Sequence, residues 1–191
     1  MKIEKTVHEK QIVCVGKLEQ EYCFLAMRNV RGFMPEDWTE IARTSSVEET
    51  QRVAGALAGV VESGSVVTLD GDLGAGKTHF TQGLGTALGI AEPITSPTFN
   101  LMVAYGDGHI PLYHFDLYRL ESADQLEDLA FYEYVEGDGV SCVEWASKFP
   151  DDMPEDRLEV FISVEGECER AISARAFGSA GVLLQAWVDA L

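Results

Sequence analysis

The chain has 191 residues, of which 46% are hydrophobic and 24% charged, as is typical of one globular domain with a short extension at one end. This balance excludes collagen, wholesale disorder and small disulfide scaffolds. Fourteen basic residues against 32 acidic residues give a formal net charge of −18. Because such a surface repels phosphate backbones, the composition disfavours direct nucleic-acid binding and favours a basic partner protein.

The sequence shows no sign of export or of membrane insertion. The start, MKIEKTVHEK, has no apolar run behind its basic residues, unlike a secretory signal. The longest uncharged stretch of the first helical pattern, residues 53–61, is too short to span a membrane. The four cysteines form neither a C-x-x-C pair nor a zinc spacing. We therefore expect a cytoplasmic protein with reduced thiols.

The first half of the chain predicts an extension followed by a strand and two helices. Within residues 1–43 only Gln11–Val15 has the pattern of a strand, and residues 36–38 are typical of a loop, so we expect an N-terminal extension of unreadable role at 1–43 and the main domain at 44–191. Ser46 begins a helix with a capping-box pattern. The β-branched run Ser65–Asp70 predicts a buried strand. A glycine-rich turn and a second helix follow, and that helix stops at Gly89.

The second half is richer in strands. Residues 100–105 and 111–117 predict two strands joined by a glycine turn, and 157–164 and 171–177 predict a closing pair. A further apolar strand is expected at 140–145, with helices at 122–129 and 182–190. Strands that alternate with helices indicate an α/β sandwich with a mainly parallel central sheet.

The glycine-rich turn carries the pattern that predicts chemistry. It reads GDLGAGKT, a full G-x-x-x-x-G-K-T between a strand and an amphipathic helix, which is the context a phosphate-binding P-loop requires. Glycines let backbone N–H groups turn inward around a phosphate, and the start of the helix adds a positive dipole. A lysine at this position reaches the β- and γ-phosphates, and the hydroxyl after it ligates Mg²⁺. The predicted nucleotide-binding residues are Gly71, Asp72, Leu73, Gly74, Ala75, Gly76, Lys77 and Thr78.

Two carboxylates are candidates for the acid that a P-loop site needs on a second strand. Glu144 ends an apolar run of the kind that lies beside a P-loop strand, whereas Asp116 ends a run with a proline and more polar groups. Position favours Glu144 on the Mg²⁺ side and leaves Asp116 to orient water or the switch. Either acid can instead be a solvated residue at the end of its strand.

The loop Ile94–Phe99 follows the P-loop helix, where P-loop hydrolases place a segment that senses the γ-phosphate. Its hydroxyls around a proline are equally typical of a plain turn, so both interpretations stay open. No N-K-x-D or T-K-x-D pattern is present, which disfavours a GTPase. Gly83-Leu84-Gly85 lies inside a helix without a preceding strand, so we reject it as a dinucleotide fingerprint. The four histidines have no metal spacing and are expected at the surface or in packing.

Taken in order, GDLGAGKT, ITSPTF, HFDLYRL and VEW closely resemble the TsaE family, small bacterial ATPases needed for the threonylcarbamoyladenosine modification of tRNA. The likeness covers about Ser45 to Phe177 and implies a P-loop NTPase-like three-layer sandwich that binds ATP and Mg²⁺. It also implies roles for Lys77 and Thr78 in the P-loop, for Thr95 in the switch-like loop, for Asp116, for Glu144 as the metal-side acid, and for Trp145, Arg170 and Thr50 near the nucleotide.

The resemblance implies that the chain is an accessory ATPase that resets or activates a complex of TsaD-type and TsaB-type proteins, with the tRNA held by those partners. The rival enzyme interpretation is a small P-loop kinase, which usually carries an arginine-bearing lid. A third class is a nucleotide-gated interaction module with negligible turnover. The family pattern does not require residues 1–33, and Met34 is an alternative start.

Overall fold

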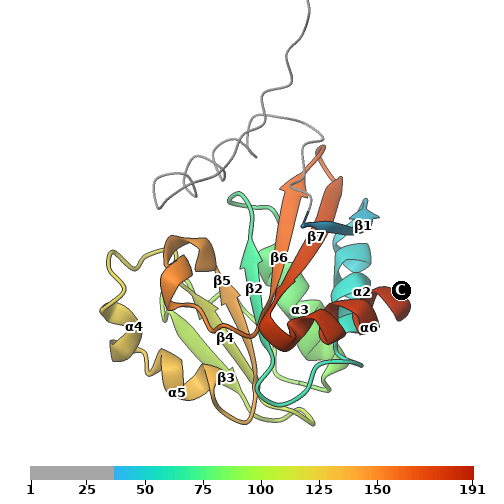
Figure 1. Ribbon diagram of the computed structural model, residues 1–191. Helices are drawn as coiled ribbons and strands as arrows, with labels where there is room; N and C mark the ends of the chain where they lie inside the picture. The colour runs from blue at the N-terminus through green and yellow to red at the C-terminus, as the bar shows by residue number, and fades with distance from the viewer. Residues whose placement is uncertain (1–36) are drawn as a thin grey trace, which may run out of the picture. The chain divides into compact units, whose positions relative to one another are not determined.

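The computed structural model describes residues 37–191, and Trp38–Leu191 form one compact unit built on a seven-stranded sheet (Figure 1). The strands are β1 (Thr39–Thr44), β2 (Val66–Asp70), β3 (Met102–Tyr105), β4 (Leu112–Asp116), β5 (Val140–Glu144), β6 (Arg157–Val164) and β7 (Arg170–Phe177). The helices are α2 (Val47–Leu57), α3 (Lys77–Ala87), α4 (Gln125–Asp128), α5 (Phe131–Val135) and α6 (Gly181–Asp189), with short 3₁₀ turns η1 (Ala146–Lys148), η2 (Pro150–Asp152) and η3 (Gly178–Ala180).

The strand order β1-β7-β6-β2-β5-β4-β3 puts the P-loop strand β2 at the middle of the sheet. β2 runs parallel to both of its neighbours, β5 and β6, and β4 runs parallel to β5. The remaining pairs, β1 with β7, β6 with β7 and β3 with β4, are antiparallel. The parallel centre confirms the expected α/β sandwich and brings the carboxyl ends of β2, β4 and β5 to one edge of the sheet.

Two hydrophobic cores lie on opposite faces of the sheet, because side chains of successive strand residues alternate between faces. Val67 and Leu69 of β2 belong to the core that α2, α3 and α6 cover, and Val66 belongs to the other. The second core is covered by α4, α5 and the turns after β5. In Figure 1 the first group of helices lies at the right of the sheet and α4 and α5 lie at its left. The result is a three-layer sandwich.

Two elements were not expected from the sequence. β1 pairs with β7 through Thr39 to Thr44, so the sheet already includes residues that we assigned to the N-terminal extension 1–43. Such an edge strand has a weak local pattern, and hydrogen bonds to β7 and packing of Ile41 on the core decide its conformation. α5 was missed because one turn and a half gives too little periodicity. The strand expected at Gln11–Val15 lies outside the described residues.

The start of α2 confirms the predicted cap. The Ser46 side chain accepts a hydrogen bond from the Glu49 amide at 3.2 Å. The Glu49 carboxylate binds the amide and hydroxyl of Ser45, and the pKa of Glu49 is lowered by these bonds.

No helix among residues 37–191 is both long enough and apolar enough to cross a membrane.

Helices α2 and α3 pack closely because a glycine faces the neighbouring backbone. A Cβ at Gly83 would lie 2.3 Å from the carbonyl oxygen of Gln51. We therefore expect Gly83→Ala to push the helices apart and to lower the free energy of unfolding by roughly 1–3 kcal/mol, as overpacking does. Urea unfolding measures the loss. Gly106→Ala is the matched control, since a Cβ there meets nothing within 4 Å. Equal stability of the two variants would contradict the close packing.

Candidate functional site

The P-loop joins the end of β2 to the start of α3, and its glycines have conformations that other residues adopt poorly. Gly71 has a φ of 143° and Gly76, the residue before α3, a φ of 112°. A Cβ at Gly71 would lie 2.3 Å from the carbonyl oxygen of Ile162, so the backbone has no room for a side chain there. With this shape the first amides of α3 face the space enclosed by the loop, which is the arrangement that binds phosphate.

Lys77, the first residue of α3, is almost fully buried at the centre of this loop. Its Nζ donates to the carbonyl oxygens of Gly71 at 2.9 Å and Asp72 at 3.0 Å. The same nitrogen lies 3.9 Å from the centre of the Trp145 ring, a cation–π contact. Burial lowers the pKa of Lys77, and the nearby carboxylates, Glu144 first among them, act in the opposite direction. The ammonium group is therefore held inside the P-loop by carbonyl groups of the loop itself.

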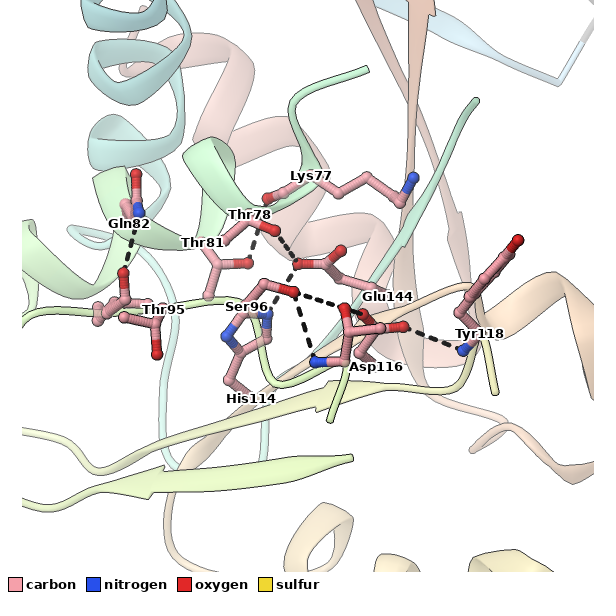
Figure 2. A network of polar contacts seen from close by, with 12 residues as sticks. Lys77, Thr78, Thr81, Gln82, Thr95, Ser96, His114, Asp116, Tyr118 and Glu144 are labelled. Atoms are coloured by element: carbon pink, nitrogen blue, oxygen red, sulfur yellow. Dashed lines mark hydrogen bonds and ion pairs between the residues drawn. The ribbon is translucent and has the colours of Figure 1, made fainter. Parts of the chain in front are cut away.

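Thr78, Glu144 and His114 meet beside the P-loop, as Figure 2 shows. The Thr78 hydroxyl donates to Glu144 Oε1 at 2.8 Å, and His114 Nε2 lies 2.9 Å from the same oxygen. Glu144 ends β5 and is 3% exposed. From the sequence we expected His114, like the other histidines, at the surface or in packing. The His114 ring is fully buried, but it also contacts the Glu144 carboxylate, and the alternation of strand residues alone does not show this contact.

A hydroxyl and a carboxylate in contact are oxygen ligands of the kind that Mg²⁺ prefers. Among residues 37–191 no group of three or more His, Cys, Asp or Glu side chains is arranged to hold a metal ion. Thr78 and Glu144 therefore suit an ion that takes its remaining ligands from nucleotide phosphates and water, as Mg²⁺ commonly does.

Asp116 lies beside Glu144, because the two residues are paired across β4 and β5. Its Oδ1 accepts a hydrogen bond from the Tyr118 amide at 3.0 Å, and its Oδ2 accepts one from the Thr98 hydroxyl. The hydroxyls of Ser96 and Thr98 are 2.6 Å apart. The loop after α3 is therefore connected to the end of β4 through hydroxyls (Figure 2).

Thr95, the hydroxyl that the sequence singled out in this loop, is not the one that reaches Asp116. The Thr95 side chain is exposed, and its amide donates to the Tyr105 hydroxyl at 3.1 Å. The contact with Asp116 comes from Thr98, which the sequence analysis missed although it belongs to the same ITSPTF segment. The path of the loop around Pro97 decides which of its hydroxyls points toward the sheet.

Arg170 and Thr50, which the resemblance places near the nucleotide, differ in their contacts: Arg170 binds the P-loop, and the hydrogen bonds of the Thr50 side chain go to Thr44 and Ser46. Arg170 begins β7, and its Nε donates to the carbonyl oxygen of Ala75 at 2.9 Å. It lines a cavity of about 300 Å³ together with residues of β1, of the start of α2 and of the β6–β7 turn. Thr50 does not line this cavity, and its buried hydroxyl lies 2.9 Å from that of Thr44. Thr44 does line the cavity.

A buried carboxylate directly before the P-loop was also missed. Asp70, the last residue of β2, accepts hydrogen bonds from the Ser147 hydroxyl at 2.7 Å and the Ser147 amide at 3.3 Å. Burial raises the pKa of Asp70 to about 6, against the opposing effect of these bonds. Ser147 follows β5 and is 77 positions from Asp70 in the chain, so no local sequence pattern indicates this contact.

The raised pKa of Asp70 makes stability depend on pH. Because the folded pKa lies above the ordinary value, the contribution of Asp70 to stability falls as pH rises from about 4 to about 6 and then stays level. We expect Asp70→Asn to gain up to about 3 kcal/mol of unfolding free energy at pH 7.5 and about half of that at pH 5. Urea unfolding at both pH values tests this, with the exposed Asp124→Asn as control. An Asp70→Asn gain that is the same at both pH values would contradict it.

The sheet order, the P-loop between β2 and α3, and the paired Thr78 and Glu144 define a P-loop NTPase-like protein. The family model "Threonylcarbamoyl adenosine biosynthesis protein TsaE" matches residues 44–172. The chain belongs to the TsaE family.

Relatives and a solved structure agree with this assignment. The tRNA threonylcarbamoyladenosine biosynthesis protein TsaE of Bacillus subtilis is 46% identical over 72% of this chain and 85% of its own length. The protein of the same name from Treponema pallidum is 41% identical over 67% of this chain and 94% of its own length. The crystal structure of Bacillus subtilis YdiB has a TM-score of 0.68 at 37% identity, covering 80% of this chain and 95% of that chain.

Proposed function

We propose that this protein binds and hydrolyses ATP with Mg²⁺, and that it serves tRNA threonylcarbamoyladenosine biosynthesis by acting on a complex of TsaD-type and TsaB-type proteins in the cytoplasm. The observation that carries the proposal is the contact of Thr78 with Glu144 at the end of a P-loop whose lysine is buried among carbonyl groups. The names of the relatives connect the family with that tRNA modification.

The residues of the site fit ATP in order along the nucleotide. Amides of the P-loop and of the first turn of α3 suit the phosphates, and Lys77 suits the β- and γ-phosphates. Thr78 and Glu144 are the proposed ligands of Mg²⁺, which would neutralise phosphate charge during transfer. Trp145 touches Lys77, and Arg170 connects the P-loop with the 300 Å³ cavity through its hydrogen bond to Ala75. We assign the sugar and base to this side of the P-loop.

Asp116 is the group that we assign to the attacking water. It is 2% exposed, lies beside the metal-side acid, and is oriented at both carboxylate oxygens by Tyr118 and Thr98. A carboxylate held in this way can accept a proton from water or align it. Because Thr98 belongs to the loop after α3, a change of that loop around the γ-phosphate would also move a hydrogen bond of Asp116.

The partner assignment has support in charge and in exposed groups. The net charge of −18 disfavours tRNA contact by this chain and favours approach to a basic protein surface. Phe99, next to Thr98, is 82% exposed, and the Arg119 guanidinium stacks on it at 4.3 Å. A partner that covers this loop would act directly on the segment that contacts Asp116. We therefore expect slow hydrolysis by the isolated chain and acceleration by the partners.

Calorimetric titration with ATP, with and without Mg²⁺, and steady-state hydrolysis with and without purified TsaD-type and TsaB-type proteins test the proposal. Mg²⁺-dependent binding and partner-stimulated turnover are expected, and the stimulation should weaken as salt rises. ATP binding without any hydrolysis would instead identify a nucleotide-gated interaction module. Fast turnover by the isolated chain, unaffected by the partners, would favour a free-standing hydrolase or a small-molecule kinase.

A further inference from the structure

The loop Trp145–Lys148 crosses the carboxyl ends of three strands at the candidate site. Its first amide, that of Trp145, donates to the carbonyl oxygen of Leu69 in β2 at 3.0 Å. Trp145 has a φ of 62°, which turns the chain sharply out of β5 and into η1. Through this turn the next residues lie over β2 and β4 instead of continuing along β5. We call these four residues the 145–148 loop.

Lys148 holds the chain segment that directly follows Asp116. Its Nζ donates to the carbonyl oxygens of Leu117 at 3.2 Å, Tyr118 at 2.6 Å and Leu120 at 2.5 Å. These three carbonyl groups belong to a tight turn over residues 117–120, which the Leu120 amide also closes by donating to the carbonyl oxygen of Leu117 at 3.1 Å. The amide of Tyr118, inside that turn, is the donor that orients Asp116 Oδ1. The peptide unit between Leu117 and Tyr118 therefore binds both residues: its N–H donates to Asp116, and its carbonyl oxygen accepts from Lys148.

The other side of the same loop is fixed to the P-loop strand. Ser147 donates through its amide and its hydroxyl to Asp70, the residue directly before Gly71. Neighbouring residues of one loop therefore contact the strand that leads into the P-loop and the turn that follows Asp116. Because Asp70 is buried, its carboxylate has little water to exchange for the Ser147 donors.

We propose that the 145–148 loop fixes Asp116 relative to the P-loop, with Lys148 as the positioning residue that holds the turn at 117–120. This inference rests on the proposed function, in which Asp116 orients the attacking water. Lys148 itself touches neither the P-loop nor the Asp116 carboxylate through any hydrogen bond that the described residues show. Its effect on Asp116 passes through the peptide group of Tyr118 and through charge, since Asp116 acts to raise the pKa of Lys148 against the effect of burial.

Lys148→Met removes the three hydrogen bonds and keeps most of the apolar stem. With the partner proteins present, we expect kcat for ATP hydrolysis to fall about tenfold while KM stays within about twofold, because a misplaced water-orienting group acts mainly in the transition state. The control is Arg52→Met, which removes one positive charge from an exposed position of α2. Arg52→Met should leave both constants unchanged. A purely structural role of Lys148 would lower the melting temperature and change kcat and KM together.

A double-mutant cycle separates positioning of Asp116 from an independent effect. If Lys148 acts through Asp116, the variant with both Lys148→Met and Asp116→Asn should hydrolyse ATP within about twofold of Asp116→Asn alone. Multiplied losses in the double variant would overturn the inference.

Hydrogen exchange of the nucleotide-free protein gives a readout that needs no activity. We expect the amides of residues 117–120 to exchange several-fold faster in Lys148→Met than in the wild type, with the amides of α2 unchanged. Unchanged exchange at 117–120 would overturn the inference, as would faster exchange with an unchanged kcat. If the wild type fails to bind ATP, the proposed function and the catalytic role of Lys148 both fall, and the exchange result still reports whether Lys148 holds the turn.

Discussion

Replacing Lys77 with alanine is expected to lower the affinity for ATP with Mg²⁺ at least about tenfold, or roughly 1.4 kcal/mol. Lys77 is 4% exposed and places its ammonium group among the carbonyl oxygens of the P-loop. In a protein with a net charge of −18, this local positive charge is what offsets the repulsion of a triphosphate. A charge-assisted contact in a desolvated loop is stronger than one at the surface.

Calorimetric titration of wild type and variant measures this loss. Lys77→Met is the matched second variant, because it keeps most of the apolar stem and removes the ammonium group together with its contact with Trp145. Similar losses in the two variants would assign the effect to the ammonium group, whereas a loss confined to alanine would assign it to packing. Affinity unchanged in both would remove the P-loop interpretation.

Asp116→Asn is expected to lower kcat for ATP hydrolysis roughly 100-fold, the lower range for removal of a positioned base, with ATP affinity within about twofold. The amide keeps the shape and one acceptor oxygen for Thr98 or Tyr118 but cannot take a proton from water. Because orienting water matters in the transition state and not in ground-state binding, the effect should appear in turnover alone.

Glu144→Gln is the comparison, since it changes the neighbouring carboxylate of the adjacent strand in the same way. It should weaken the dependence of binding on Mg²⁺, because the lost charge faces Thr78, the proposed second ligand of the metal. Turnover and titration of both variants across Mg²⁺ concentrations test the two assignments together. Loss of binding in Asp116→Asn with an unaffected Glu144→Gln would reverse the two roles.

Features that short segments encode could be predicted from the sequence. The P-loop, its flanking strand and helix, the cap at Ser46 and the antiparallel hairpin of β3 and β4 each depend on residues a few positions apart. Local hydrogen bonding and glycine conformations decide such features, so the local sequence pattern is enough to predict them. The strand that ends at Glu144 was likewise identified by its apolar run. Together with the strand predicted before Asp116, it placed both acids at the ends of strands.

Contacts between distant segments could not be predicted in the same way. β1 is a strand because it forms hydrogen bonds with the edge of the sheet at β7. Thr98 contacts Asp116, and Thr95 does not, because of the path of the loop around Pro97. His114 contacts Glu144 because β4 and β5 are paired in one particular register. A shift of one residue in that register would turn the His114 ring to the opposite face.

The sequence by itself determined the family, the α/β architecture and the place of the P-loop between β2 and α3, because each depends on patterns of neighbouring residues that can be read along the chain. The tertiary structure decided how the acids and hydroxyls around that loop are arranged. The contacts of Asp70 with Ser147 and of Lys148 with the turn after Asp116 join residues 77 and about 30 positions apart. Only the order and register of β2, β5 and β4 bring these residues to one edge of the sheet.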